Sequence, residues 1–276
     1  MRIEKRDVWF IIGFLLVVIG LLMMISIVKA APTYSNVGKN ATYIGMGENI
    51  ELRAKWTPAD APYDASTGIY NDYLDVSSQD GTPTGIAFNN DGSKLYVTGA
   101  GNSYIYEYNL STAYDISTGV YNDYLDITGN MPQGLRFNND GTKLYVVVIS
   151  ISGKYVYEYN LSAPYDISTG VYNNYLDISS QDSAPTGIAF NNDGTKLYVA
   201  GYTNDRIYEY NLSIAYDIST GVYNDYLDAS GQDTEVTDIA FNNDGTKLYV
   251  SGVANDKIYE YNLSTCLLYT SPSPRD

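Results

Sequence analysis

One unit of sequence occurs four times between Tyr63 and Thr265, and this repetition constrains the fold more than any other feature of the chain. The motif Tyr-Asp-x-Ser-Thr-Gly recurs every 51 residues, and three further motifs recur in step with it. They are Phe-Asn-Asn-Asp-Gly, Leu-Tyr-Val and Tyr-Glu-Tyr-Asn-Leu-Ser. A period near 50 residues with several short strands per unit is typical of a β-propeller, in which each unit buries its apolar face against its neighbours.

The third unit illustrates the strands that we expect in every blade. Apolar or alternating segments predict four antiparallel strands of increasing polarity, innermost strand first, at 187–190, 196–200, 206–212 and 222–228. Asn191 to Gly194 predicts a tight hairpin turn, because Asn, Asp and Gly tolerate positive φ. We therefore expect an all-β propeller of four-stranded blades, with the units 63–113, 114–164, 165–215 and 216–265.

The strand Gly-Ile-Ala-Phe, the turn Asn-Asp-Gly and the strand Lys-Leu-Tyr-Val together resemble the YVTN-type β-propeller repeat family over residues 63–265. The chain departs from that family's pattern by a longer loop, Ala-Tyr-Asp-Ile-Ser-Thr-Gly, before the fourth strand. The resemblance implies a surface protein with a scaffold or binding role. It indicates a fold and does not identify a ligand.

The phase of the repeat predicts how the ring of blades closes. The repeats begin with an outer-strand segment, Ile69 to Val76, and end after a third strand, Ile258 to Leu263. The first segment could complete the last blade and so cover an exposed sheet edge. Residues 266–276 break the repeat and resemble a translated sequencing adapter, so we expect a non-native tail and a truncated ring; the alternative is a short disordered tail.

The N-terminal residues 1–30 predict export of the repeats. Residues 8–28 form an uncharged apolar run that would span about 31 Å as a helix, close to the roughly 30 Å of a bilayer core. Arg2, Lys5 and Arg6 precede it, which favours a cytoplasmic N-terminus and extracellular repeats. We expect one transmembrane anchor; a cleaved signal peptide, giving a secreted protein, is the alternative. Residues 31–62 are expected to form a linker or a short strand pair.

Composition excludes several classes of function. The chain has 32 acidic and 16 basic residues, a net charge of −16, which disfavours nucleic-acid partners because these need basic patches. Histidine is absent, and Cys266 in the expected tail is the only cysteine. We find no catalytic motif and no metal-ligand spacing, and we expect no cofactor.

Sequence differences among the units predict where a partner binds. The loops between second and third strands, and those between blades, vary over a constant scaffold, and binding residues often lie on such loops. The candidate binding residues are Asn102, Tyr104, Ser152, Lys154, Tyr202, Asn204, Asp205, Arg206, Asn255, Asp256 and Lys257, with the mouth of the central channel beside them.

Two further sets of residues carry weaker predictions. Three blade-to-blade loops contain Ser-Gln-Asp or Gly-Gln-Asp, and their carboxylates could bind Ca²⁺, although a turn with local hydrogen bonds is the simpler interpretation. These carboxylates are Asp80, Asp182 and Asp233. Five sites fit the N-glycosylation acceptor, and a structural role at strand ends explains four of them equally well. They are Asn40, Asn109, Asn160, Asn211 and Asn262.

The sequence therefore favours a membrane-anchored surface propeller that binds a protein or glycan and is not an enzyme. Two alternatives stay open: an extracellular propeller enzyme acting on sugars or lactones, and a purely structural repeat of a cell envelope or virion. Acids converging in the channel would favour the enzyme, because paired carboxylates serve as general acid and base. A channel lined by tyrosine, threonine and small apolar residues would favour the binding module.

Overall fold

The structure, a computed structural model, describes residues 69–127 and 129–263 of the 276. The chain divides into two units, 1–70 and 71–276, and the described fold belongs almost entirely to the second. The predictions for residues 1–30, 31–62 and 266–276 lie outside the described residues. Among the residues that are described, no helix has the length and apolar character that crossing a membrane requires.

Four antiparallel sheets, one for each repeat, confirm the propeller prediction. Each sheet is a meander whose strands pair in chain order. Blade 1 comprises β1 (Pro83–Phe88), β2 (Lys94–Gly99), β3 (Tyr104–Leu110) and β4 (Gly119–Asp126). Blade 2 comprises β5 (Asn130–Phe137), β6 (Lys143–Ser150), β7 (Gly153–Leu161) and β8 (Gly170–Asp177). Blade 3 comprises β9 (Pro185–Phe190), β10 (Lys196–Gly201), β11 (Arg206–Leu212) and β12 (Gly221–Asp228), and blade 4 comprises β13 (Val236–Phe241), β14 (Lys247–Gly252) and β15 (Lys257–Asn262).

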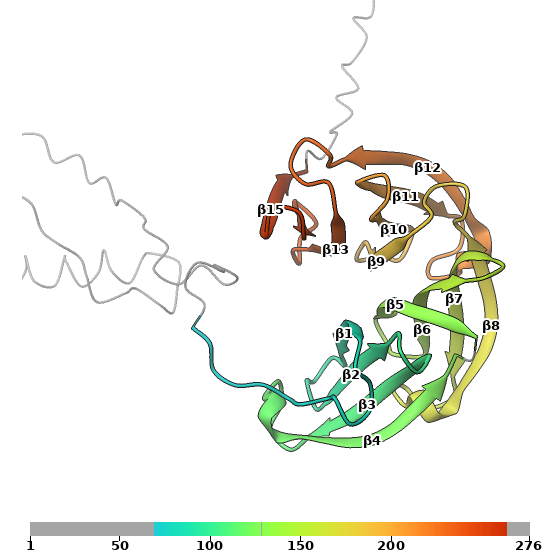
Figure 1. The fold of residues 1–276 in the computed structure, drawn as a ribbon. Coiled ribbons are helices and arrows are strands. Elements are labelled where there is room, and N and C mark those ends of the chain that lie inside the picture. The colour runs from blue at the N-terminus through green and yellow to red at the C-terminus, as the bar shows by residue number, and fades with distance from the viewer. Residues whose placement is uncertain (1–68, 128, 264–276) are drawn as a thin grey trace, which may run out of the picture. The chain divides into compact units, whose positions relative to one another are not determined.

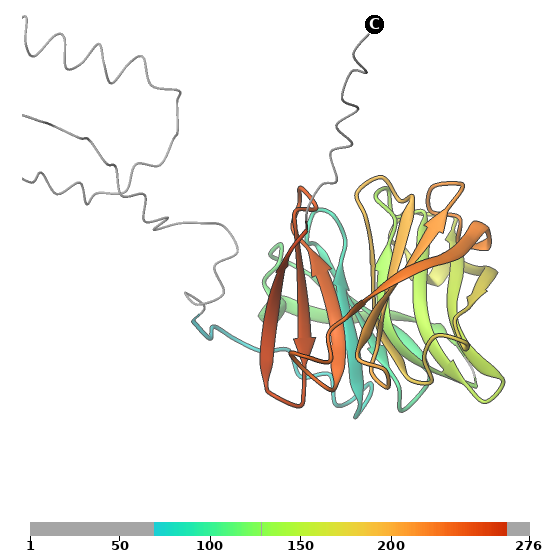
Figure 2. The ribbon, with the colours of Figure 1, turned by 90° about the horizontal axis from the view of Figure 1, so that it is seen from above.

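The innermost strands β1, β5, β9 and β13 surround a common axis, and β4, β8 and β12 form the outer rim (Figure 1). Strand β5 contacts both β1 and β9, and β13 contacts β9, so successive blades touch along the axis. The connections gather at the two ends of the strands (Figure 2). A short 3-10 helix precedes each outer strand in the first three blades: η2 (Ile116–Thr118), η3 (Ile167–Thr169) and η4 (Ile218–Thr220).

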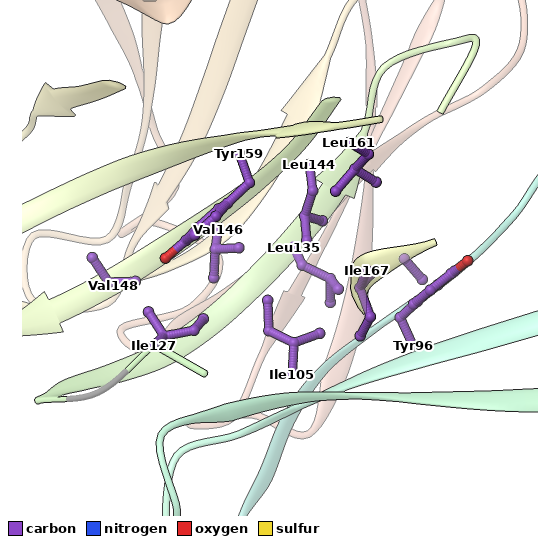
Figure 3. Packing of buried hydrophobic residues seen from close by; sticks show 11 residues of the cluster. Tyr96, Ile105, Ile127, Leu135, Leu144, Val146, Val148, Tyr159, Leu161 and Ile167 are labelled. Carbon is purple, nitrogen blue, oxygen red and sulfur yellow. The ribbon is translucent and has the colours of Figure 1, made fainter. Parts of the chain in front are cut away.

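The core lies between neighbouring blades. One cluster joins Ile105 of blade 1 to Leu135 and Val146 of blade 2, and Tyr96 and Tyr159 contribute their rings to it (Figure 3). Each blade has apolar side chains on both faces of its sheet, so it is buried only where a neighbour packs against it. The repeated Leu-Tyr-Val and Tyr-Glu-Tyr motifs are therefore explained mainly by packing between blades.

Within residues 69–127 and 129–263, no blade packs on the side of blade 1 that faces away from blade 2. Ile86 in β1 is 59% exposed, whereas Ile188 at the same position of blade 3 is 1% exposed. The expected outer strand at Ile69 to Val76 is also absent: these residues form no strand, although Leu74 and Val76 pack against blade 1. A strand exists only as part of a hydrogen-bonded ladder, and no described strand pairs with this segment. It therefore does not complete blade 4, where β15 stays the edge of a three-stranded sheet.

Candidate functional site

The two ends of the blades form two faces with different chemistry. We call the turn face the end that carries the hairpin turns Asn89–Gly92, Asn138–Gly141, Asn191–Gly194 and Asn242–Gly245 with the 3-10 helices. We call the loop face the opposite end, which carries the loops between second and third strands and the blade-to-blade connections. The hydrogen bond from the Tyr114 backbone N–H to the Gly92 carbonyl joins the two elements of the turn face at 2.8 Å.

Side chains within each Asn-Asn-Asp-Gly turn fix its conformation. In blade 1 the Asn89 carboxamide accepts from the Lys94 backbone N–H at 3.0 Å and donates to Ser93 Oγ at 3.0 Å. Gly92 has φ +71°, and the Tyr114 ring occupies the space that a Cβ at this position would need. The turn therefore requires glycine both for its backbone conformation and for the packing of Tyr114.

The second asparagine of each turn connects one blade to the next. Asn90 Nδ2 donates to the Asn139 carbonyl at 2.7 Å, and Asn139 Nδ2 donates to the Asn192 carbonyl at 2.9 Å. Asn192 Nδ2 donates in turn to the Asn243 carbonyl at 2.6 Å. A chain of carboxamides thus crosses all four blades at the mouth of the channel, which explains why this residue is identical in every unit.

A Lys–Glu pair beneath the turn face also joins neighbouring blades. In blade 2 the fully buried Glu158 accepts from Lys143 Nζ at 2.8 Å and from Asn173 Nδ2 at 2.7 Å. Its other oxygen accepts the backbone N–H of Ile218, at the start of the 3-10 helix of blade 3, at 3.4 Å. Blade 1 repeats the arrangement with Lys94 and Glu107. Sequence reasoning missed this network, although the Lys and Glu recur at fixed positions in all four units.

A pocket of about 270 Å³ opens on the turn face between blades 2, 3 and 4. Its walls are asparagine carboxamides, phenylalanine and tyrosine rings and two alanines, and Arg136 is the only charged residue among the described residues that line it. The lining residues are Arg136, Phe137, Asn139, Ala189, Phe190, Asn191, Asn192, Tyr216, Ala240, Phe241, Asn242 and Asn243. The loop-face prediction included none of these residues.

The aromatic wall of this pocket is held in place by ring contacts between blades. The Phe190 ring lies 4.6 Å from Tyr145 of blade 2 and 5.3 Å from Tyr216 of its own blade, measured between ring centroids. The Phe241 ring lies 4.7 Å from Tyr198 of blade 3. Burial raises the pKa of the Tyr145 hydroxyl well above its usual range, and this hydroxyl donates to the Tyr216 carbonyl. The wall is therefore preformed, as in most binding pockets.

On the loop face, the three aspartates named as metal candidates accept hydrogen bonds from backbone N–H groups. Asp80 accepts the backbone N–H of Thr82 at 2.7 Å and of Asn102 at 2.8 Å. Burial acts to raise the pKa of Asp80, but these N–H donors outweigh it and hold the pKa below its usual value. Asp182 and Asp233 bind their loops in the same way. Within the described residues no cluster of three or more metal-ligating side chains occurs.

Blade 2 lacks this acidic residue and compensates with longer strands. Gly99, Gly201 and Gly252 lie against Asp80, Asp182 and Asp233, where a Cβ would collide with the carboxylate. Blade 2 has Val148 at that position, and Asn130 to Pro132 extend the β5–β6 ladder in place of the aspartate loop. The sequence difference on the loop face is therefore partly a change in how the loop is stabilised.

Most of the predicted binding residues on the loop face already have partners within the protein. The carboxamides of Asn102, Asn204 and Asn255 donate to the carbonyls of Gln79, Gln181 and Gln232. Tyr104 packs on Tyr124, and the Arg206 guanidinium lies 4.0 Å from the Tyr226 ring centroid. Ser152 bonds Ser150, and Lys154 Nζ donates to the Ser150 carbonyl. Tyr202 is half-buried, while Asp256 and Lys257 are exposed.

Asp205 is the predicted loop-face residue with the most unusual environment. It adopts φ +54°, and its Oδ1 is buried without a hydrogen-bond partner. Burial, together with the nearby carboxylates of Asp233 and Asp182, raises its pKa above the usual value. A binding role for the loop face stays a prediction.

The four repeat asparagines of the glycosylation prediction are placed alike. Asn109, Asn160, Asn211 and Asn262 are exposed at the ends of third strands. Their side chains are accessible from solvent, and their modification stays a prediction. Asn40 lies outside the described residues.

Comparisons with known proteins identify no family for the chain. No protein-family model matches the chain, and no curated protein matches it. Among solved structures, a proposed 6-phosphogluconolactonase of Bacteroides fragilis is similar with a TM-score of 0.49 and 15% identity, over 71% of this chain and 55% of that one. The Cps50 (Swd1) β-propeller domain of Myceliophteria thermophila has a TM-score of 0.45 and 15% identity, over 66% of this chain and 54% of that one. Hydrazine synthase of Kuenenia stuttgartiensis has a TM-score of 0.46 and 12% identity, over 65% of this chain and 58% of that one. The chain thus spans little more than half of these structures.

Proposed function

We propose that this protein is a surface binding module whose partner is a glycan held in the pocket on the turn face. The observation that carries the proposal is the pocket lining. Carboxamides both donate and accept hydrogen bonds, as sugar hydroxyls require, and aromatic rings offer apolar faces to a sugar ring. The volume lies just under the about 300 Å³ at which pockets for drug-sized ligands begin, which suits one residue at the end of a larger ligand.

The same lining favours binding over hydrolysis. Glycoside hydrolysis in most families requires a pair of carboxyl groups at the reacting bond. Of the lining residues that the structure describes, none is Asp or Glu. The acidic residues of the loop face are instead engaged with backbone N–H groups of their own loops. We therefore assign the pocket a recognition role.

A screen of glycans against the full-length chain tests this function. We expect at least one glycan to bind and the variant Ala240→Trp to abolish its binding, because Ala240 is exposed and lines the pocket. The matched control is Ile151→Trp, which adds the same side chain at a fully exposed position of the loop face. Retained binding in Ala240→Trp, or loss in Ile151→Trp, would contradict the assignment.

We further propose that residues 8–28 anchor the module in a membrane and that the repeats face the exterior. The support is the length and apolar character of the run and the basic residues that precede it. Deletion of residues 1–30 should move the protein from the membrane fraction to the soluble fraction. An unchanged membrane fraction would rule the anchor out.

A further inference from the structure

One residue of the pocket breaks the repeat. The innermost strand of blades 1 and 3 begins Pro-Thr-Gly-Ile-Ala, and its fifth residue is alanine. The innermost strand of blade 4 also has alanine at this fifth position. Blade 2 has Arg136 at this position, which corresponds to Ala87, Ala189 and Ala240 in the other units. Neighbouring positions keep their packing roles, since Leu135 is as buried as Ile188 and Ile239. The substitution therefore adds a cation at the channel without altering the core.

The guanidinium of Arg136 extends across the channel and has only weak partners. Its Nη1 donates to the carbonyls of Leu135 at 3.2 Å and Ile86 at 3.3 Å, and its Nη2 donates to the Ile239 carbonyl at 3.4 Å. All three are longer than the usual 2.9–3.0 Å or so of an N–H···O bond. These contacts orient the side chain between blades 1, 2 and 4, and all three acceptors are neutral backbone carbonyls.

No carboxylate in the described part of the chain forms an ion pair with Arg136, and this contrasts with the other repeat cations. Lys94, Lys143, Lys196 and Lys247 each pair with a glutamate of their own blade. Acidic residues outnumber basic ones two to one, so an unpaired arginine in the channel is an exception to the charge distribution of this chain. A fixed cation in a partly enclosed site attracts an anion.

The carboxylate of Asp238 interacts electrostatically with Arg136. It occupies the position where the other three units have glycine, and it does not line the pocket. The Asp238 side chain is exposed, and its charge interacts with that of Arg136. Its negative charge opposes an anion in the pocket, so its removal should strengthen anion binding.

From this geometry we propose that the pocket selects a sugar that carries a carboxylate, with Arg136 as the residue that recognises the acidic group. The inference rests on the proposed glycan-binding function. A guanidinium presents paired N–H donors that match the two oxygens of a carboxylate. The asparagines and aromatic rings around it match the hydroxyls and the apolar face of the sugar ring. Arg136 is thus assigned as the specificity residue, and the neutral lining as the residues that hold the sugar.

Calorimetric titration of the full-length chain with matched sugars tests the proposal. The probes are methyl glucuronoside and methyl glucoside, their galacto counterparts, and inorganic phosphate. We expect a uronoside to bind about tenfold more tightly than its neutral partner, as a charge-assisted hydrogen bond would provide. Arg136→Ala restores the residue of the other units and should abolish this preference, Arg136→Lys should reduce it, and Asp238→Gly should increase it.

The outcomes separate this inference from the function on which it rests. Equal affinity for uronoside and neutral sugar in the unmodified protein would overturn the role of Arg136 while glycan binding stands. Phosphate that binds as tightly as the uronoside would show a general oxyanion site and overturn the sugar-acid assignment. If a neutral glycan from the screen binds and neither uronoside does, the proposal of an acidic sugar is wrong while the glycan-binding function stands. A melting temperature of Arg136→Ala close to that of the unmodified protein excludes unfolding as the cause of lost binding.

Discussion

The turn face and the loop face are stabilised in different ways, and the difference bears on where a ligand binds. On the turn face the second asparagine of each turn donates to the next blade, and the buried glutamates accept from the next blade's 3-10 helix. On the loop face the bonds of each aspartate stay within one blade and its incoming connection. The turn face therefore forms a continuous surface across blades, and it contains the pocket.

In this protein, the positions that vary among the units are not the positions that line the pocket, with the exception of Arg136. Residues identical in every unit are commonly taken as structural, and residues that differ as functional. Here the identical asparagines both join the blades and line the pocket. Much of the loop-face variation follows from the exchange of an aspartate and glycine for a longer ladder in blade 2. The departure at Arg136, by contrast, places a charged side chain in the lining of the pocket.

The largest effect on stability is expected at the buried Lys–Glu pair beneath the turn face. Glu158→Gln leaves Lys143 without its counter-ion and should lower the free energy of unfolding by about 3 kcal/mol. The matched variant Glu209→Gln changes the same position of blade 3, where the glutamate side chain is 21% exposed, and should cost about 1 kcal/mol or less. Chemical denaturation measures both. Equal losses would show that contact between blades does not determine the strength of the pair.

An intermediate effect is expected from the aspartates of the loop face. Asp182→Ala leaves the backbone N–H groups of Ala184, Thr203 and Asn204 without their acceptor and should cost about 2 kcal/mol. Asp193→Ala is the control on the turn face, because this exposed carboxylate caps only its own hairpin at Thr195. It should cost about 0.5–1 kcal/mol. A larger loss in Asp193→Ala would reverse the comparison of the two faces.

The smallest effect is a dependence of stability on pH. The pKa of Asp80 is lower in the folded protein than its usual value, so its contribution is complete above the unfolded pKa of about 3.9 and is lost as pH falls through the folded pKa. Denaturation midpoints should therefore decline below about pH 5. Asp80→Asn should make this decline shallower. A profile of Asp80→Asn that parallels the unmodified protein would show that Asp80 does not contribute.

The fold was predictable because repeat length and strand alternation act locally and recur four times. Strands β10 and β11 were predicted within one residue at each end, and the Asn-Asn-Asp-Gly turns were assigned correctly. The strand predicted at Ile69 to Val76 is absent. This prediction was wrong because a strand depends on a partner that lies elsewhere in the chain. The local hydrogen bonds predicted for Asp80 are present, since its carboxylate accepts backbone N–H groups from two segments.

The candidate site was less predictable, because it is built from residues about 50 positions apart. Sequence comparison of the units located variation on the loop face, whereas the pocket depends on how blades 2, 3 and 4 meet. The departures at Arg136 and Asp238 were visible in the aligned units. Their significance required knowing that the innermost strands face a common channel.

Hydrogen–deuterium exchange of the full-length chain, with and without a saturating glycan ligand, tests the central claim most directly. Binding in the turn-face pocket predicts ligand-dependent protection at 136–139, 190–192 and 241–243. Protection confined to the loop-face segments 99–104, 150–154, 202–206 and 253–257 would contradict the account and would place the binding site on the variable loops.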